Sequence, residues 1–118
     1  MSIATVQMVT IDCPDPVALG RFYQKVLGGE LDTGEEGWAV LQPVDGPRLG
    51  FQGVAGHTAP TWPEGPVPQQ SHLDLTVADL EAAEKEVLAL GATLLEARPE
   101  HGWRVYADPV GHTFCLGL

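Results

Sequence analysis

The sequence predicts an α+β fold built from two tandem copies of one βαβββ module. Three observations predict it. Two alternating segments lie 64 residues apart, each is followed by a helix with a matching cap, and each helix is followed by three short strand candidates. A chain of 118 residues has the length of one ordinary domain. We therefore expect a single domain over residues 1–118, with a first module over 1–55, a linker over 56–70 and a second module over 71–118.

The first strand of each module alternates apolar and polar residues, in MVTIDCPD at 8–15 and HLDLTVAD at 72–79. Alternate residues of a strand point to opposite faces of the sheet. The helix-facing set is Val9, Ile11, Cys13, Leu73, Leu75 and Val77. The opposite face carries Met8, Thr10, Asp12, His72, Asp74 and Thr76. We expect this second set to face the functional site.

A helix follows each of these strands. Asp15 and Asp79 are placed as N-caps, because a short carboxylate accepts hydrogen bonds from the first turn and complements the helix dipole. Pro16 suits the first helical position, and apolar residues at helical spacing give each helix one buried face. Gly28 and Gly91 are placed to end the two helices.

Three strand candidates follow each of these glycines, separated by turn residues. They cover residues 29–33, 38–42, 48–53, 92–98, 103–107 and 112–118. Between the modules, GHTAPTWPEGPVPQQ at 56–70 is too rich in proline for a helix or a central strand. We expect a passive connection, and the alternative is a lid that carries Trp62 over the mouth of a pocket.

Composition and charge exclude several classes of protein. Sixteen acidic and six basic residues give a net charge of −10, which repels phosphate backbones and anionic membranes. The sequence has neither a signal peptide pattern nor the ~20 apolar residues of a membrane span. Cys13 and Cys115 are the only cysteines and lack CxxC spacing, which is typical of reduced thiols. We expect a cytoplasmic protein that binds neither nucleic acid nor membranes.

Three segments resemble the vicinal oxygen chelate (VOC) superfamily of glyoxalases, bleomycin-resistance proteins, fosfomycin-resistance enzymes and extradiol dioxygenases. They are DPVALGRFYQKVLGGE at 15–30, PQQSHLDLTVADLEAAE at 68–84 and DPVGHTFCL at 108–116. The resemblance covers nearly the whole chain and is greatest to small bacterial glyoxalase-like proteins. It implies a cup-shaped, eight-stranded mixed sheet, a small-molecule ligand in the cup between the modules, and a homodimer.

The resemblance also maps the superfamily's metal positions onto this chain, at Met8, Gln52, His72 and Cys115. Hard divalent ions prefer carboxylate ligands, and none of the four residues has one. Only His72 is an unambiguous ligand. We therefore expect no metal and no other cofactor, with a divalent metal as the alternative. Glyoxalase I activity is not expected without a Lewis acid to stabilise the enediolate.

If the protein is an enzyme, the candidates for catalysis are His72, Asp74 and Cys115. Asp12 or Asp74 would act as a general base if an apolar cup raised the pKa of its carboxyl group, and hydrogen-bonded scaffolding is the alternative. His72 would activate Cys115 as a nucleophile by lowering the thiol pKa, and an inert buried thiol is the alternative. His112 lies in the DPVGHT turn, where we assign it a turn role.

Three functions remain open, and the third and least specific of them is a dimerising accessory domain whose cup is not used. In the first, a glyoxalase-like VOC protein binds a small metabolite through Met8, Gln52, His72, Cys115 and Trp62, with lyase or isomerase chemistry if it is an enzyme. In the alternative, a metal-free protein of the bleomycin-resistance type sequesters a cationic drug. The net charge of −10 and the aromatic residues are compatible with this alternative.

Overall fold

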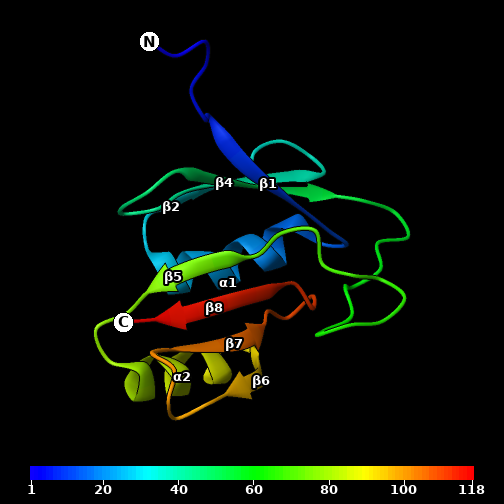
Figure 1. Ribbon diagram of the computed structural model, residues 1–118. Coiled ribbons are helices and arrows are strands. Elements are labelled where there is room, and N and C mark those ends of the chain that lie inside the picture. The colour runs from blue at the N-terminus through cyan, green and yellow to red at the C-terminus, as the bar shows by residue number, and fades with distance from the viewer. The chain divides into compact units, whose positions relative to one another are not determined.

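The computed structural model describes residues 1–118, which form two compact units, Met1–His57 and Thr58–Leu118. Each unit contains one βαβββ module (Figure 1). The eight expected strands and two expected helices are all present, with the strands in two four-stranded mixed sheets. The predicted α+β class and the repeat of one module are therefore confirmed.

The first unit runs through β1 (Met8–Cys13), α1 (Pro16–Leu27), β2 (Glu30–Asp32), β3 (Trp38–Gln42) and β4 (Arg48–Gly53). The strand order in its sheet is β1-β4-β3-β2. The first and last strands pair in parallel, and the two other pairings are antiparallel. A parallel pair needs a long crossover, which α1 and the β2–β3 hairpin supply.

Three aromatic residues pack together in the core of the first unit. The ring of Tyr23 stacks on that of Phe51, with centroids 5.7 Å apart, and meets Phe22 edge to face. Such pairs add to the stability that apolar burial provides. The buried apolar residues of this unit are Cys13, Leu19, Phe22, Tyr23, Ala39, Leu41, Leu49 and Phe51.

The second unit runs through β5 (Leu73–Thr76), α2 (Leu80–Ala89), β6 (Thr93–Ala97), β7 (Trp103–Ala107) and β8 (Thr113–Gly117). Its strand order, β5-β8-β7-β6, repeats that of the first unit. Its first and last strands, β5 and β8, again pair in parallel. Its buried apolar residues are Leu80, Val87, Ala92, Val105, Tyr106, Phe114 and Leu116. Two of their rings, Tyr106 and Phe114, stack with centroids 5.4 Å apart.

Both helices begin as predicted. Asp15 accepts a hydrogen bond from the backbone of Ala18, and Asp79 accepts one from Ala82, each at 3.1 Å. These bonds satisfy donors that the first turn of a helix leaves free. Gly28 caps the end of α1 with a φ of 70°, a conformation that favours glycine.

A polar network joins α2 to β7. Arg104 pairs with both Glu81 and Glu84, and the Tyr106 hydroxyl donates to Glu84 Oε1 at 2.9 Å. The bond to Glu81 is the main cause that raises the pKa of Arg104. Burial, followed by the bond to Glu84, raises the pKa of Tyr106 to about 12. The network therefore joins the helix to the sheet through a tyrosine that keeps its proton at neutral pH.

In each module the first strand pairs with the last strand, but the register of this pairing differs between the two modules. In the first unit Ile11 lies opposite Phe51, whereas in the second Leu73 lies opposite Phe114. The sequence offset of 64 between the first strands would have placed Leu75 opposite Phe114. The register is thus shifted by two residues, which keeps every side chain on its expected face but changes its neighbour across the ladder.

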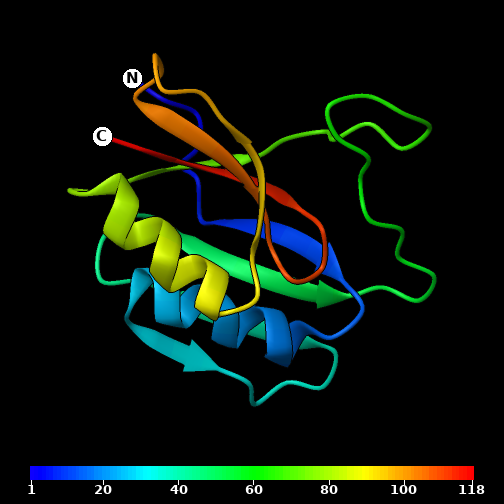
Figure 2. The same ribbon diagram turned by 90° about the horizontal axis from the view of Figure 1, so that it is seen from below.

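The proline-rich linker has no helix or strand (Figure 2), and from Thr58 onward it belongs with the second unit. Thr61 closes a loop in it, because its backbone N–H donates to Val67 at 2.6 Å and its hydroxyl also bonds to Val67. Ala59 lies against the turn between β7 and β8, where a Cβ on Gly111 would be 2.6 Å from the Ala59 Cβ. No helix in the structure has the length and apolar character needed to cross a membrane.

Candidate ligand-binding site

A pocket of about 660 Å³ lies within the second unit. Strands β5, β7 and β8 form part of its wall, and the linker adds Trp62 and Gln69. The passive connection expected for residues 56–70 therefore also contributes side chains to a pocket. The lining residues are Trp62, Gln69, His72, Asp74, Leu75, Thr76, Gly102, Trp103, Val105, Thr113, Cys115, Gly117 and Leu118.

Strand pairing places the side chains of this wall in rows. Asp74 lies opposite Cys115, and Cys115 lies opposite Val105, so one row crosses three strands. The next row, two residues along each strand, is Thr76, Gly117 and Trp103. Alternation sends Phe114 of β8 to the core and Cys115 to the pocket.

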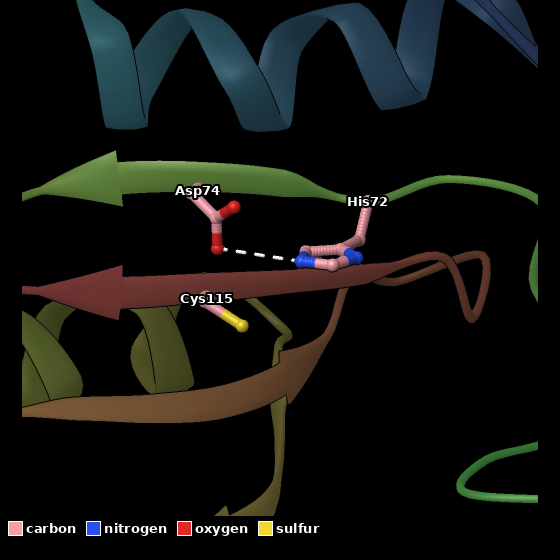
Figure 3. A group of neighbouring side chains, drawn as sticks. All are labelled: His72, Asp74 and Cys115. Carbon is pink, nitrogen blue, oxygen red and sulfur yellow. Dashed lines mark ion pairs between the residues drawn. The ribbon is translucent and has the colours of Figure 1, made fainter. Parts of the chain in front are cut away.

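Three of the lining residues form a cluster, shown in Figure 3. The Nε2 of His72 is 3.4 Å from Asp74 Oδ1. One side-chain donor atom from each of His72, Asp74 and Cys115 lies within 4.8 Å of the other two. The His72 and Asp74 side chains are 38% and 77% exposed, so solvent weakens their ion pair. The three candidates for catalysis are therefore brought together at the wall of one pocket.

The Cys115 thiol is held in its protonated form. Burial is the main cause that raises its pKa to about 11, and the charge of Asp74, a hydrogen bond with Asp74 and the charge of Glu96 add to it. A nucleophilic thiolate requires a lowered pKa. Although His72 lies nearby, the shift has the opposite sign, which favours an unreactive thiol.

The two metal positions in the first unit do not form a matching pair. Met8 lies opposite Arg48, whereas Gln52 lies opposite Asp12. Gln52 therefore lies level with a residue four positions along β1 from Met8, an offset of about 13 Å at the usual rise of a strand. The Met8 side chain instead lies over Gly50, where a Cβ would be 2.9 Å from the Met8 sulfur.

This donor set does not fit the divalent metal centre that the superfamily implies. Met8 and Gln52 are neutral and weak ligands, and Cys115 must lose a proton that its surroundings retain. Only His72 among the four mapped residues binds a divalent ion readily. Asp74 adds a carboxylate to the cluster, but it does not occupy one of the four mapped positions.

Among the lining residues that the sequence does not indicate, two have polar side chains, Gln69 and Thr113. Thr113 is only 4% exposed, and its hydroxyl oxygen is buried without a hydrogen-bond partner. The Oε1 atom of Gln69 is also buried without a partner. Alternation from Cys115 would have placed Thr113 on the pocket face, but nothing in the sequence marks its hydroxyl as unsatisfied.

The DPVGHT turn sets the position of Thr113. Asp108 is 3% exposed, and its Oδ1 accepts hydrogen bonds from the backbone of Val110, Gly111 and His112 at 2.9, 3.0 and 3.0 Å. The Asp108 N–H also donates to the His112 carbonyl at 2.8 Å. The backbone of His112 thus has the turn role assigned to this residue, and the turn leads directly into Thr113 at the start of β8.

Comparison with known proteins places this architecture in a family. Residues 8–117 match the model of the glyoxalase-like domain. No curated protein matches the sequence. Among solved structures, a glyoxalase/bleomycin resistance/dioxygenase family enzyme from Burkholderia phytofirmans PsJN has a TM-score of 0.70 and 22% identity, covering 96% of this chain and 97% of that chain.

Two further similar structures have ligands or binding named in their descriptions. A mutant of the genomically encoded fosfomycin resistance protein from Listeria monocytogenes, complexed with Mn(II) and a dihydroxypropylphosphonic acid, has a TM-score of 0.72 and 15% identity. It covers 99% of this chain and 92% of that chain. An antibiotic binding protein from a Streptomyces species has a TM-score of 0.65 and 20% identity, covering 99% and 97%. At these identities the likeness shows the shared fold.

Proposed function

The chain belongs to the glyoxalase-like domain family, and on that premise we propose that its second unit binds a small metabolite without a metal. The observation that carries the proposal is the pocket lined by Trp62 and Trp103 beside the His72, Asp74 and Cys115 cluster. Its volume of about 660 Å³ lies within the ~300–1,000 Å³ of ordinary small-molecule sites. Glyoxalase I activity is not part of the proposal, because the donor set does not fit the required metal.

The charges around the pocket favour neutral or cationic ligands. Asp74 has the only lining side chain with a formal charge when His72 is neutral, and the lining contains no lysine or arginine. An anionic group would therefore enter a negative field without a cation to bind it. The phosphonic acid named for the similar fosfomycin resistance protein is such a group, and this pocket does not suit it.

The experiment is a binding measurement with variants of the tryptophans. Quinoline, a neutral aromatic probe, is titrated at millimolar concentration and followed by ligand-observed NMR. Replacing Trp62 or Trp103 with leucine should weaken binding by ~5-fold or more, since each indole supplies stacking surface. The matched control is Trp38→Leu in the first unit, which should bind like the parent protein. Equal binding by all four proteins, or no binding at all, would contradict the proposed pocket.

Sequestration of a cationic drug is the second candidate function. Asp74 beside Trp62 and Trp103 supplies the charge and the aromatic surface that attract a flat organic cation. The similar Streptomyces protein is described as an antibiotic binding protein, so the same fold binds an antibiotic elsewhere. A cationic glycopeptide antibiotic should then raise the melting temperature at low salt, because a ligand that binds the folded state stabilises it. No shift at a large molar excess would remove this candidate.

Assembly and location are proposed as the superfamily resemblance suggests, a homodimer in the cytoplasm. Both cysteines are free, which suits a reducing compartment. Light scattering should give twice the chain mass of 12.6 kDa, and a monomer at micromolar concentration would contradict the homodimer.

A further inference from the structure

We propose that Gly117 is a specificity residue, because it leaves a slot beside the indole of Trp103 that admits a flat aromatic ring of the ligand. The slot is the space above Gly117 on the pocket face of the sheet, between the side chains of Trp103 and Thr76. This inference rests on the proposed function, since it names the class of ligand that the same pocket selects, planar aromatic and heteroaromatic rings. None of the three residues is a mapped metal position or a member of the cluster of titratable groups.

Strand pairing gives the slot its width. Gly117 of β8 lies opposite Thr76 of β5 on one side and opposite Trp103 of β7 on the other. Neighbouring strands lie ~4.8 Å apart, and paired residues present their side chains on the same face. A ring that stands above Gly117 is therefore one strand spacing from the indole, within the ~4.5–7 Å at which aromatic rings stack. The Trp103 side chain is still 41% exposed, so it has surface left for such a ring.

Neither the backbone nor the packing of the protein requires a glycine at position 117. Its φ is not positive, and an added Cβ would meet only the Gly102 carbonyl at 3.5 Å and the Trp103 Cβ at 3.6 Å, which are ordinary contacts. Gly50 of the first sheet is different, because a Cβ there would lie 2.9 Å from the Met8 sulfur. A glycine weakens a strand and often marks a place where a ligand approaches closely. The missing side chain at position 117 is thus accounted for by a ligand rather than by the fold.

His101 holds the indole of Trp103 in place. The two rings stack with centroids 4.5 Å apart and an angle of 20° between their planes. His101 is not one of the lining residues, so its ring covers the indole from outside the pocket. An indole that is already fixed loses less freedom when a ligand binds, which favours affinity. A ring in the slot would extend this stack by one member.

The test compares a flat probe with a puckered one. Quinolin-2-one and octahydroquinolin-2-one are neutral lactams with the same amide group and the same number of ring atoms, but only the first is planar and aromatic. Dissociation constants are measured by ligand-observed NMR. We expect the flat lactam to bind ~5-fold or more tightly, because it fits the slot and stacks on the indole.

Side chains of increasing size at position 117 should close the slot. Gly117→Ala should weaken quinolin-2-one ~3-fold and Gly117→Val ~10-fold or more, the scale on which a pocket responds to single carbon groups. In Gly117→Val the preference for the flat lactam should fall to ~2-fold or less. Gly117→Ala should melt at or above the temperature of the parent protein, because alanine fits the site and restricts the unfolded chain.

Gly53→Ala is the matched control. Gly53 ends β4, as Gly117 ends β8, and it also lacks a positive φ. A Cβ there would lie 3.4 Å from its nearest neighbours, the Gly37 carbonyl and Pro16 Cδ, and it does not line the pocket. This variant should keep the affinity of the parent protein for both lactams.

The slot and the proposed function fail in different ways. Equal binding of the two lactams, or full affinity for quinolin-2-one in Gly117→Val, would overturn the slot while the binding function stands. A melting temperature of Gly117→Ala more than ~3 °C below that of the parent would give the glycine a structural role and overturn it as well. If neither lactam binds at millimolar concentration, the slot is wrong, and the quinoline titration decides separately whether the pocket binds ligands.

Discussion

Asp74 lies directly opposite Cys115 on the parallel strands β5 and β8, and its carboxylate helps to keep the Cys115 thiol protonated. Asp74→Asn removes that negative charge and should lower the thiol pKa from about 11, although burial remains the larger cause. The rate of alkylation by iodoacetamide at pH 8.5 should rise ~3-fold or more, because the thiolate is the reacting form. Mass spectrometry of the modified peptide measures the rate.

Cys13 provides the internal control for this experiment, since it is fully buried and should stay unmodified in both proteins. An unchanged or slower rate at Cys115 in the variant would show that the carboxylate does not control the thiol.

Tyr106 should make the protein less stable at alkaline pH. Its pKa in the folded protein is about 12, against 10.0 for the unperturbed group. Between these values the unfolded chain has lost a proton that the folded chain keeps, so the free energy of unfolding falls as pH rises. Below pH 10 both states keep the proton and the effect vanishes. Tyr106→Phe should therefore lose less stability between pH 9 and pH 11 than its parent.

Urea midpoints at the two pH values measure this difference. Both proteins should carry Cys115→Ala, because the thiol titrates over an overlapping range. At neutral pH the phenylalanine variant should be less stable by ~1 kcal/mol, since it lacks the hydrogen bond to Glu84. If both proteins lose the same free energy of unfolding between pH 9 and pH 11, Tyr106 is not the cause of the loss.

Substitution of Asp108 should reduce the stability of the protein more than substitution of most other residues in the second unit. Asp108→Ala removes the acceptor of three backbone hydrogen bonds in a buried turn. The expected loss is ~2–4 kcal/mol in the free energy of unfolding, from urea denaturation. Asp45→Ala, at an exposed loop position, should change stability by less than ~0.5 kcal/mol. Similar effects of the two substitutions would mean that the turn bonds contribute little.

Gly111 allows a test of the contact between the linker and the β7–β8 turn. Gly111 and Gly46 have nearly the same φ, +103° and +101°, but only at Gly111 would a Cβ collide, 2.6 Å from that of Ala59. Substituting either glycine with alanine strains the backbone by ~1–2 kcal/mol. Gly111→Ala should cost at least ~1 kcal/mol more. Equal losses of stability would show that Ala59 moves aside freely.

Adding divalent metals tests the conclusion that Met8, Gln52, His72 and Cys115 do not form a metal site. Ni²⁺, Zn²⁺ and Mn²⁺ at ten molar equivalents should shift the melting temperature by less than ~2 °C, because weak binding stabilises little. A stoichiometric complex that disappears in His72→Ala would reverse the conclusion. His57→Ala is the matched control, since His57 lies in the first unit and outside the cluster.

The sequence predicted the order of elements because the signals for them are local. Asp15 and Asp79 cap helices within three residues of themselves, and alternation assigns each strand residue to a face. Register is different, because a shift of two residues leaves every face unchanged. For that reason alternation placed His72, Asp74 and Cys115 together but did not show that Asp74 is the residue opposite Cys115.

The polar lining residues Gln69 and Thr113 were missed for another reason. Whether the hydroxyl of Thr113 is satisfied depends on every group that packs around it, and Gln69 reaches the pocket only through the path of the linker. Tertiary placement of this kind leaves no periodic trace in the sequence. The linker's prolines indicated an irregular segment but not which of its side chains would line a wall.

The parallel pairing of β5 with β8 affects how the protein is made on the ribosome. β8 lies between β5 and β7 and is the last strand in the chain. The β6–β7 hairpin can pair earlier, but β5 has no partner until residues 113–117 have been synthesised, so the second sheet is completed only after synthesis of this segment. The first sheet is complete at residue 53 and can fold during translation, since domains generally fold as units from the N-terminus. Until β8 emerges, the unpaired β5 edge is exposed to other nascent chains, a hazard that chaperones would have to control.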